Sequence, residues 1–435
     1  MQTEKIISNF QRESLKKAKT YLKKSLNKNV DIEISPCCDF VTWVNCLGYQ
    51  KIKLLKNNAI LSFDFLKTLL IEIFSIGKNY NFLQFKSLVN NKKKINVIYS
   101  YCSKENFSDK GVFYDYYFNC GSLLPNTYWF LISIDNYIPK KCKNISIIYR
   151  GKKNYNIVYL FKYLFKNFLN GNILHNINNT SNVSQIWSKI FFHTFKDCKF
   201  NLFLPFENRP HQNAVIRETK NISKNNQIYC YYHRMPEPLQ SEMFYKNKFI
   251  KKLFVCSNIQ KEVFQKYFMW PSKKIKVIPS LRYKKLKIRK NTIFLPYEIK
   301  KESFYIEKLK FLLKNNNIKP TSFEVSIHPL KKHSEKHKNL KNKIYLLLKT
   351  LKNKNKNNCS IILGEPGGVA AECLQTNGKV YHITDSFFDI FSKSMWKYIE
   401  ISIISDFIYL YKMDKKQKLL NTNNKTNNFK YLNLV

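Results

Sequence analysis

The sequence predicts an α/β fold made of two Rossmann-like domains whose parallel sheets face a central cleft. Three observations lead to this prediction. At 435 residues the chain is longer than one average domain, and its 44% hydrophobic residues are enough for substantial cores. From residue 95 onward, short apolar runs alternate with helical stretches, which is typical of parallel strands joined by crossover helices.

The first domain is expected over residues 1–285. Residues 1–30 combine lysines with apolar side chains near helical spacing, which predicts an amphipathic helix that packs on the core, with a membrane-facing helix as the alternative. Ser257 precedes Gln260 by three residues, so a helix is expected to begin after Ser257. Helices are also predicted at 60–74 and 157–168, and strands at 95–101, 129–134, 145–149, 201–205, 227–232, 249–256 and 276–279.

A second domain is expected over residues 286–411, after the basic stretch KKLKIRKN. Residues 412–435 are expected to be a frayed, low-complexity tail. Strands are predicted at 292–295, 323–327, 360–363 and 379–383, and helices up to about 314, at 345–351, at 370–374 and from Ser386 to about Leu410.

The formal net charge of +46 has two interpretations. Only seven of the 75 basic residues are arginines, and the other 68 are lysines scattered through Asn-rich and Ile-rich sequence. Because no recognition motif gathers these lysines, we expect no specific nucleic-acid partner. Attraction to an anionic membrane surface stays open, as does a non-enzymatic basic protein that binds nucleic acid or anionic lipid.

Cysteines and apolar runs indicate a compartment. The eleven cysteines include no C-x-x-C pair, so we expect reduced thiols and no metal site. No apolar run approaches the ~20 residues that a membrane-spanning helix needs. These features predict a cytoplasmic protein, with peripheral attachment to the inner face of the cytoplasmic membrane left open.

Charged loops follow two neighbouring predicted strands of the first domain. The strand at 201–205 leads into Glu207, Arg209 and His211, and the next strand leads into His233 and Arg234. Because parallel neighbours end at the same edge of a sheet, we expect the two loops to form one site.

A second candidate site lies in the second domain. The run from Gly364 to Gly368 follows a predicted strand and precedes a helix, an arrangement in which backbone N–H groups can approach a phosphate. Glu372 in that helix could accept hydrogen bonds from ribose hydroxyls, and His328, after another strand, could donate to the same phosphate. The sequence therefore favours a nucleotide site here.

Several motifs resemble known glycosyltransferases. The pair His328-Pro329 and the small-residue turn before Glu372 are similar to the donor domain of GT-B glycosyltransferases, and the His-Pro placement resembles bacterial sialyltransferases and polysialyltransferases. In the first domain, PFENRPHQ, YYHR, FVCS and SLRY resemble surface carbohydrate biosynthesis proteins of bacterial polysaccharide loci. The resemblance covers roughly residues 95–400. It departs where a Ser/Thr pair is replaced by Gly367-Gly368, so phosphate contacts would come from the backbone.

The resemblance implies a GT-B enzyme that transfers a sugar from a nucleotide-sugar donor, of which a CMP-linked sugar is one example, to a surface polysaccharide such as lipopolysaccharide or to a lipid-linked glycan. Inverting, metal-independent transfer without a cofactor is expected, with Glu207 as base and His211 as its substitute. The donor-binding residues would be His328, Gly364, Glu365, Gly367, Gly368 and Glu372. The acceptor-binding residues would be Asp115, Arg209, His233, Arg234, Glu237 and Arg282.

Two other enzymes on a similar fold stay open as alternatives. One is a sugar-nucleotide epimerase, which would convert its nucleotide sugar without an acceptor. The other is a polyol-phosphate transferase.

Overall fold

The structure is a computed structural model of the whole chain. It describes residues 2–27, 70, 78–85, 94–122, 124–155, 157–169, 179–234, 241–283, 286, 291–299, 301–315, 323–328, 331–351, 361–364, 367–413 and 417–422. Of the helix expected at 60–74, all but residue 70 lies outside this part of the chain.

The first unit is built on an eight-stranded sheet in the order β1-β6-β5-β2-β7-β8-β9-β10. All neighbours are parallel except β1, which pairs antiparallel with β6 at the edge. The order reverses between β2 and β7, and such a switch point is where doubly wound sheets bind ligands. The strands are β1 (Lys78–Gln84), β2 (Ile95–Cys102), β5 (Thr127–Ser133), β6 (Ile145–Tyr155), β7 (Phe200–Pro205), β8 (Gln227–Tyr231), β9 (Lys252–Val255) and β10 (Ile275–Val277).

Local sequence explains these elements well. Every residue of β5, TYWFLIS, is buried, as expected for a central strand of a sheet covered on both faces. The Oγ atom of Ser257 accepts a hydrogen bond from the backbone N of Gln260 at 3.2 Å, as predicted. The helices are α4 (Ile157–Leu169), α6 (Asn179–Phe195), α7 (Pro210–Ile222) and α8 (Asn258–Lys266), with 3-10 turns η3 (Lys104–Asn106), η4 (Ser241–Phe244) and η5 (Ser272–Lys274) and a small hairpin, β3 (Tyr114–Asp115) and β4 (Cys120–Gly121).

The second unit has a six-stranded sheet in the order β12-β11-β13-β14-β16-β15. The first four strands are parallel, and their order reverses between β11 and β13. Two Rossmann-like units in an α/β fold are therefore confirmed; a boundary at residues 285 and 286 stays a prediction. The elements are β11 (Thr292–Phe294), α9 (Glu302–Asn315), β12 (Glu324–Ser326), α10 (Glu335–Thr350), β13 (Ile361–Leu363), α11 (Gly368–Gln375), β14 (Val380–Ile383), η8 (Phe387–Asp389), β15 (Ile399–Ser405) and β16 (Ile408–Met413).

The prediction of one or two helices from Ser386 to Leu410 is wrong. This stretch contains the short η8 turn, the whole of β15 and the start of β16, and the two strands pair as an antiparallel hairpin. The first five residues of β15, IEISI, alternate isoleucine with polar residues, a period-two pattern of β-branched side chains that favours a strand over a helix.

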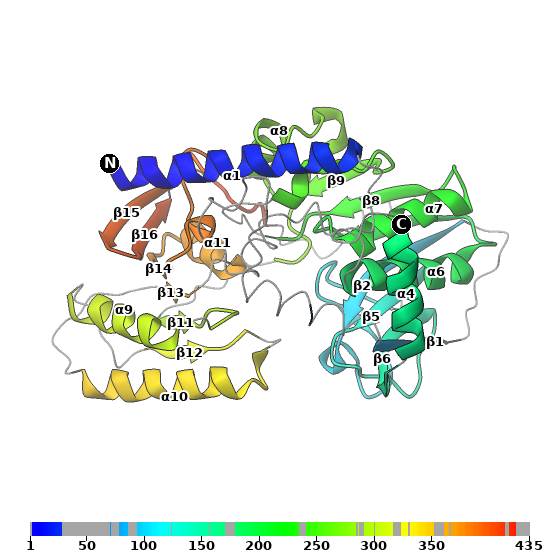
Figure 1. Cartoon of the computed structure of the whole chain (residues 1–435), viewed down its shortest axis with the longest axis horizontal. Helices are drawn as coiled ribbons and strands as arrows, with labels where there is room; N and C mark the ends of the chain where they lie inside the picture. Colours follow the sequence, from blue (N-terminus) through cyan, green and yellow to red (C-terminus); the bar gives the residue numbers. More distant parts are fainter. Residues whose placement is uncertain are drawn as a thin grey trace.

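The N-terminal helix α1 (Gln2–Asn27) packs against both units (Figure 1). Its residues Ile7, Leu15, Ala18 and Leu22 are buried, and it lies against η4 of the first unit and η8 of the second. The side-chain amide of Gln11 donates to the backbone oxygens of Phe387 at 2.8 Å and Ile390 at 2.6 Å. The preference for a core-packing helix is confirmed, and the membrane-facing alternative is wrong for this face.

The chain also returns to the first unit near its C-terminal end. Leu419 and Leu420 are buried. The backbone N of Asn421 donates to the oxygen of Cys256 at 2.9 Å, and the N of Ser280 donates to the oxygen of Asn421 at 2.6 Å. The expectation of a frayed tail is therefore wrong for residues 417–422, where backbone pairing and two buried leucines hold the chain.

Candidate functional site

The charged loops after β7 and β8 meet at one edge of the first sheet. Pro205 of β7 is in register with Tyr231 of β8, so the residues that follow each strand lie side by side. Oε1 of Glu207 lies 3.2 Å from Nε2 of His233 and 3.0 Å from Nε of Arg234. This geometry confirms that the two loops share one edge.

Glu207 has a strongly cationic environment. Its second oxygen, Oε2, lies 3.3 Å from Nε of Arg209. Burial by itself would raise the pKa of Glu207, but the charges of Arg234, His233 and Arg209 outweigh it and hold the pKa well below its usual range. Glu207 therefore stays ionised near neutral pH and is a weak proton acceptor.

His233 is held between Glu207 and an aromatic ring. Its side chain is only 3% exposed, and the ring of Tyr117 packs edge-on against it with centroids 4.5 Å apart. Burial lowers the pKa of His233, although the hydrogen bond to Glu207 opposes this. A neutral ring that donates Nε2–H to Glu207 leaves a lone pair on Nδ1, and among the described residues Nδ1 has no hydrogen-bond partner.

His211 lies at the switch point between β2 and β7. Its Nδ1 is 2.7 Å from the hydroxyl of Tyr99, and its ring lies 5.1 Å from the ring of Trp187. Burial, followed by the charge of Arg209, lowers the pKa of His211 to about 3. An imidazole with this pKa accepts protons poorly near neutral pH, so His211 is better suited to packing than to base catalysis.

Asp115 is fully buried. It accepts hydrogen bonds from the hydroxyl of Ser100 and from the backbone N atoms of Tyr117 and Phe118, the latter two at 2.7 Å. Burial raises its pKa to about 6. The carboxylate holds the turn that carries Tyr117 and has no exposed surface for a sugar, which corrects the expected acceptor contact to a structural role.

Arg282 follows β10 of the first sheet, and His328 follows β12 of the second. The exposed guanidinium of Arg282 lies 5.8 Å from the ring centroid of Tyr117. Burial and the charges of Lys331 and Arg282 lower the pKa of His328, which packs edge-on against Tyr297 in the second unit.

An ion pair joins the loop after β12 to the loop after β2 of the first sheet. Nζ of Lys332, after β12, lies 4.0 Å from Oε1 of Glu105, after β2. The loops at these strand ends therefore face one another across the two units.

Gly364 and Gly367, in the turn after β13, have different surroundings. A Cβ on Gly364 would lie 2.5 Å from Cδ of Pro296, so this glycine permits close packing against the loop after β11. Gly367 precedes the first residue of α11, and a Cβ there would meet no atom within 4 Å. The turn is thus crowded at Gly364 and open at Gly367.

Of the other predicted donor and acceptor residues, two lie in α11 and two lie outside the described residues. Gly368 begins α11, and Glu372 is buried within that helix. Glu237 and Glu365 lie outside the described residues.

Two residues of the site were not predicted from the sequence. Tyr117 connects His233 to Arg282 through its ring, and Glu242 in η4 lies 3.6 Å from the Nη1 atom of Arg234. Tyr117 belongs to a run of aromatic residues, which was the only available signal. Nothing in the sequence around Glu242 indicated that η4 would reach this edge.

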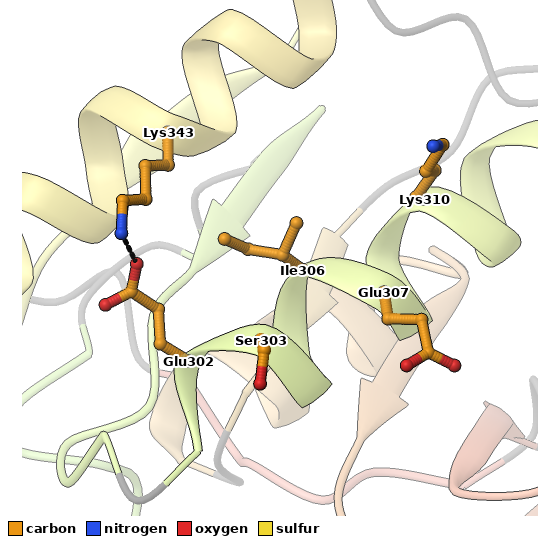
Figure 2. A pocket seen from close by; sticks show the side chains of 6 residues that line it. All are labelled: Glu302, Ser303, Ile306, Glu307, Lys310 and Lys343. Carbon is orange, nitrogen blue, oxygen red and sulfur yellow. Dashed lines mark ion pairs between the residues drawn. The ribbon is translucent and has the colours of Figure 1, made fainter.

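A groove of about 740 Å³ between α9 and α10 is lined by Glu302, Ser303, Ile306, Glu307, Lys310 and Lys343 (Figure 2). Glu302 and Lys343 pair with each other at 2.5 Å. The described residues include no group of three or more His, Cys, Asp or Glu side chains that could share a metal ion. None of their helices has the length and apolar character needed to cross a membrane.

Comparisons with known proteins add little. No family model matches the sequence, and no curated protein matches it. A crystal structure of a glycosyltransferase from Rickettsia africae ESF-5 is similar with 12% identity and a TM-score of 0.28, over 63% of this chain and 75% of the other. A likeness at that TM-score carries no argument about activity.

Proposed function

We propose that the protein is a glycosyltransferase that moves a sugar from a nucleotide-sugar donor to a glycan acceptor. The observation that carries the proposal is the meeting of two Rossmann-like units at the carboxyl ends of their strands, where doubly wound sheets bind ligands. There the Glu207–His233–Arg234 group of the first unit contacts Tyr117, whose ring lies beside Arg282, and the charge of Arg282 lowers the pKa of His328 in the second unit.

The donor would bind to the second unit. Backbone N–H groups at the start of α11 attract an anion, and Gly367 leaves room for a phosphate to approach them. His328 lies in the same unit after β12. These features support a nucleotide phosphate as ligand, and CMP-linked, CDP-linked, UDP-linked and GDP-linked sugars are its candidate sources.

The acceptor would bind to the first unit, and transfer would invert the anomeric carbon. In one displacement, the acceptor oxygen forms a bond to that carbon while the bond to the phosphate oxygen breaks. The nucleotide leaves with the electron pair, and a base takes the proton of the acceptor hydroxyl. Arg209, Arg234 and Arg282 supply positive charge for the leaving phosphate, so we propose that no metal ion is needed.

The environment of Glu207 favours a revised assignment of the base. We propose that Nδ1 of His233 accepts the proton of the acceptor hydroxyl. Glu207, whose Oε1 lies 3.2 Å from Nε2 of His233, would then orient the imidazole ring. The Tyr117 ring packs against His233 and Nδ1 is buried, so we propose that side chains around Nδ1 move before an acceptor reaches it. Glu207 acting directly as base is the alternative that the experiment below separates.

The first experiment measures nucleotide binding by equilibrium dialysis with CMP, CDP, UDP and GDP at low and moderate salt. The proposal expects selective binding of one nucleotide that is weakened in Gly367→Ala or His328→Ala. Equal binding of every nucleotide, lost on adding salt, would instead indicate a general lysine surface and would remove the main support for the donor site.

The second experiment measures sugar transfer from the selected donor to a glycan or lipid-linked glycan. His233→Asn should reduce single-turnover transfer by roughly 10²–10⁴-fold, while the matched change at exposed His193 should leave it intact. If Glu207→Gln abolishes transfer and His233→Asn does not, Glu207 is the base. Donor conversion without an acceptor would instead identify an epimerase, and transfer lost in EDTA would contradict the metal-independent mechanism.

A further inference from the structure

Helix α4 exposes an apolar stripe on the first unit. Ile157, Val158, Phe161 and Phe165 are 57%, 58%, 64% and 66% exposed. At about 100° per residue, these four positions fall within an arc of roughly 100° on one side of the helix. Most isolated surface apolar residues need no explanation, but a continuous stripe with two phenylalanines indicates a binding face.

The opposite side of α4 already has its packing partners. Leu160 and Tyr163 are buried in a small cluster of their own, separate from the main core. The hydroxyl of Tyr159 donates to Oδ1 of Asn182 on α6 at 2.5 Å, and Figure 1 shows α4 beside α6 at the surface of the unit. The packing of α4 on the first unit therefore does not use the exposed stripe.

The charge of α4 indicates what the stripe contacts. The helix sequence IVYLFKYLFKNFL contains Lys162 and Lys166 and no acidic residue, and exposed Lys162 follows Phe161 directly. The whole chain carries a formal charge of +46. A second copy of so cationic a chain would be repelled, whereas a surface of anionic lipids attracts lysines and accepts apolar side chains beneath its headgroups.

We propose that α4 docks the protein on an anionic membrane surface. Ile157, Val158, Phe161 and Phe165 enter the boundary between headgroups and acyl chains, and Lys162 stays at the headgroups. With 13 residues α4 is about 20 Å long, so it lies in the plane of the interface and does not span it. This inference is independent of the proposed transferase reaction.

The test measures co-sedimentation of the full chain with vesicles of equimolar phosphatidylglycerol and phosphatidylcholine, and with phosphatidylcholine alone. The double variant Phe161→Ser with Phe165→Ser should reduce partitioning to the anionic vesicles roughly 100-fold, because two phenylalanine side chains no longer enter apolar medium. A matched control is Phe311→Ser with Leu346→Ser, on α9 and α10, at positions 41% and 63% exposed. The control should partition within about twofold of the unchanged protein, since its residues lie outside α4.

Binding to anionic vesicles that is lost in the α4 variant and kept in the control supports the proposal. Unchanged binding by the α4 variant overturns it, as does an equal loss in the control, because either result assigns attachment to the general lysine surface. A dimer of the unchanged protein that the α4 variant converts to a monomer would also overturn it, since the stripe would then bind a second copy. Circular dichroism confirms that both variants fold.

Discussion

Nε2 of His233 lies 3.2 Å from Oε1 of Glu207, although 25 intervening residues separate them in the sequence. The contact exists because β7 and β8 are parallel neighbours that end at the same edge. It joins a carboxylate whose pKa is held low to an imidazole whose pKa is also lowered. At neutral pH the pair is therefore an ionised Glu207 bound to a neutral His233.

Replacing Glu207 by Gln should destabilise the fold near neutral pH. Arg209, Arg234 and His233 would lose the carboxylate that they share, and we expect a loss of about 1–3 kcal/mol in the free energy of unfolding. Because the folded pKa is below the unfolded value of 4.5, this stabilisation is present above pH 4.5 and is lost as the pH falls through the folded pKa. The free energy of unfolding of the variant should therefore fall less steeply as the pH is lowered below 4.5.

Urea unfolding from neutral to acid pH checks this prediction. Glu262→Gln is the control, because Glu262 pairs with Lys397 at 2.8 Å in an exposed position and should contribute less than about 1 kcal/mol. Equal stability losses in the two variants would contradict a special role for the Glu207 group.

Buried His382 should make stability fall in mild acid. Its Nδ1 lies 3.0 Å from the hydroxyl of Tyr411, and burial lowers its pKa from 6.5 to about 3. The unfolded chain therefore takes up a proton below pH 6.5 that the folded protein does not, so stability is complete above pH 6.5 and is lost as the pH falls. This group alone should remove roughly 2–3 kcal/mol between pH 6.5 and 4.5.

Denaturant unfolding at several pH values measures that slope. His382→Gln should reduce it, whereas the same change at exposed His193 should not. A proton titration of His382 near pH 6.5 in the folded protein, followed by NMR, would show that the ring is not held neutral as described.

Gly364 and Gly367 should respond differently to alanine. A Cβ at Gly364 would lie 2.5 Å from Cδ and 2.7 Å from N of Pro296, so Gly364→Ala should cost about 1–3 kcal/mol through overpacking. At Gly367 the backbone is extended and the Cβ meets nothing within 4 Å, so stability should change by less than about 0.5 kcal/mol. Chemical denaturation measures both, and equal costs would contradict the open turn.

Leu419 and Leu420 should contribute strongly to stability. Both are buried, and replacing either by alanine should cost about 2–5 kcal/mol because a cavity replaces the side chain. Thermal and urea unfolding measure the loss, with Leu346→Ala as the control at an exposed position. A cost at Leu419 as small as at Leu346 would mean that this segment does not dock in solution.

Sequence patterns predicted most of the parallel strands. The runs at 95–101, 129–134 and 227–232 correspond to β2, β5 and β8, because strands buried on both faces are continuously apolar. The same reasoning missed β15 and β16, where the antiparallel hairpin carries mixed polar and apolar residues. Helix α10 begins at Glu335, ten residues before its predicted start, because exposed lysines obscure the spacing of Leu340 and Ile344.

The sequence predicted which residues belong to the candidate site but not the environment of each side chain. The sequence placed Glu207, His233 and Arg234 after neighbouring strands, which was enough to expect one shared edge. It could not indicate that both oxygens of Glu207 would be paired with basic side chains or that Asp115 would be buried in a turn. Both outcomes depend on burial and on charges contributed by distant segments.

By itself, the amino-acid sequence determined the α/β class, the positions of most strands and the charged loops that follow them, because these depend on local periodicity and on the order of residues along the chain. Only the tertiary structure decided that Tyr117 lies between His233 and Arg282, that α1 packs against both units and that α4 keeps an exposed apolar stripe. These relationships depend on which surfaces of distant elements cover one another, and no local pattern records that.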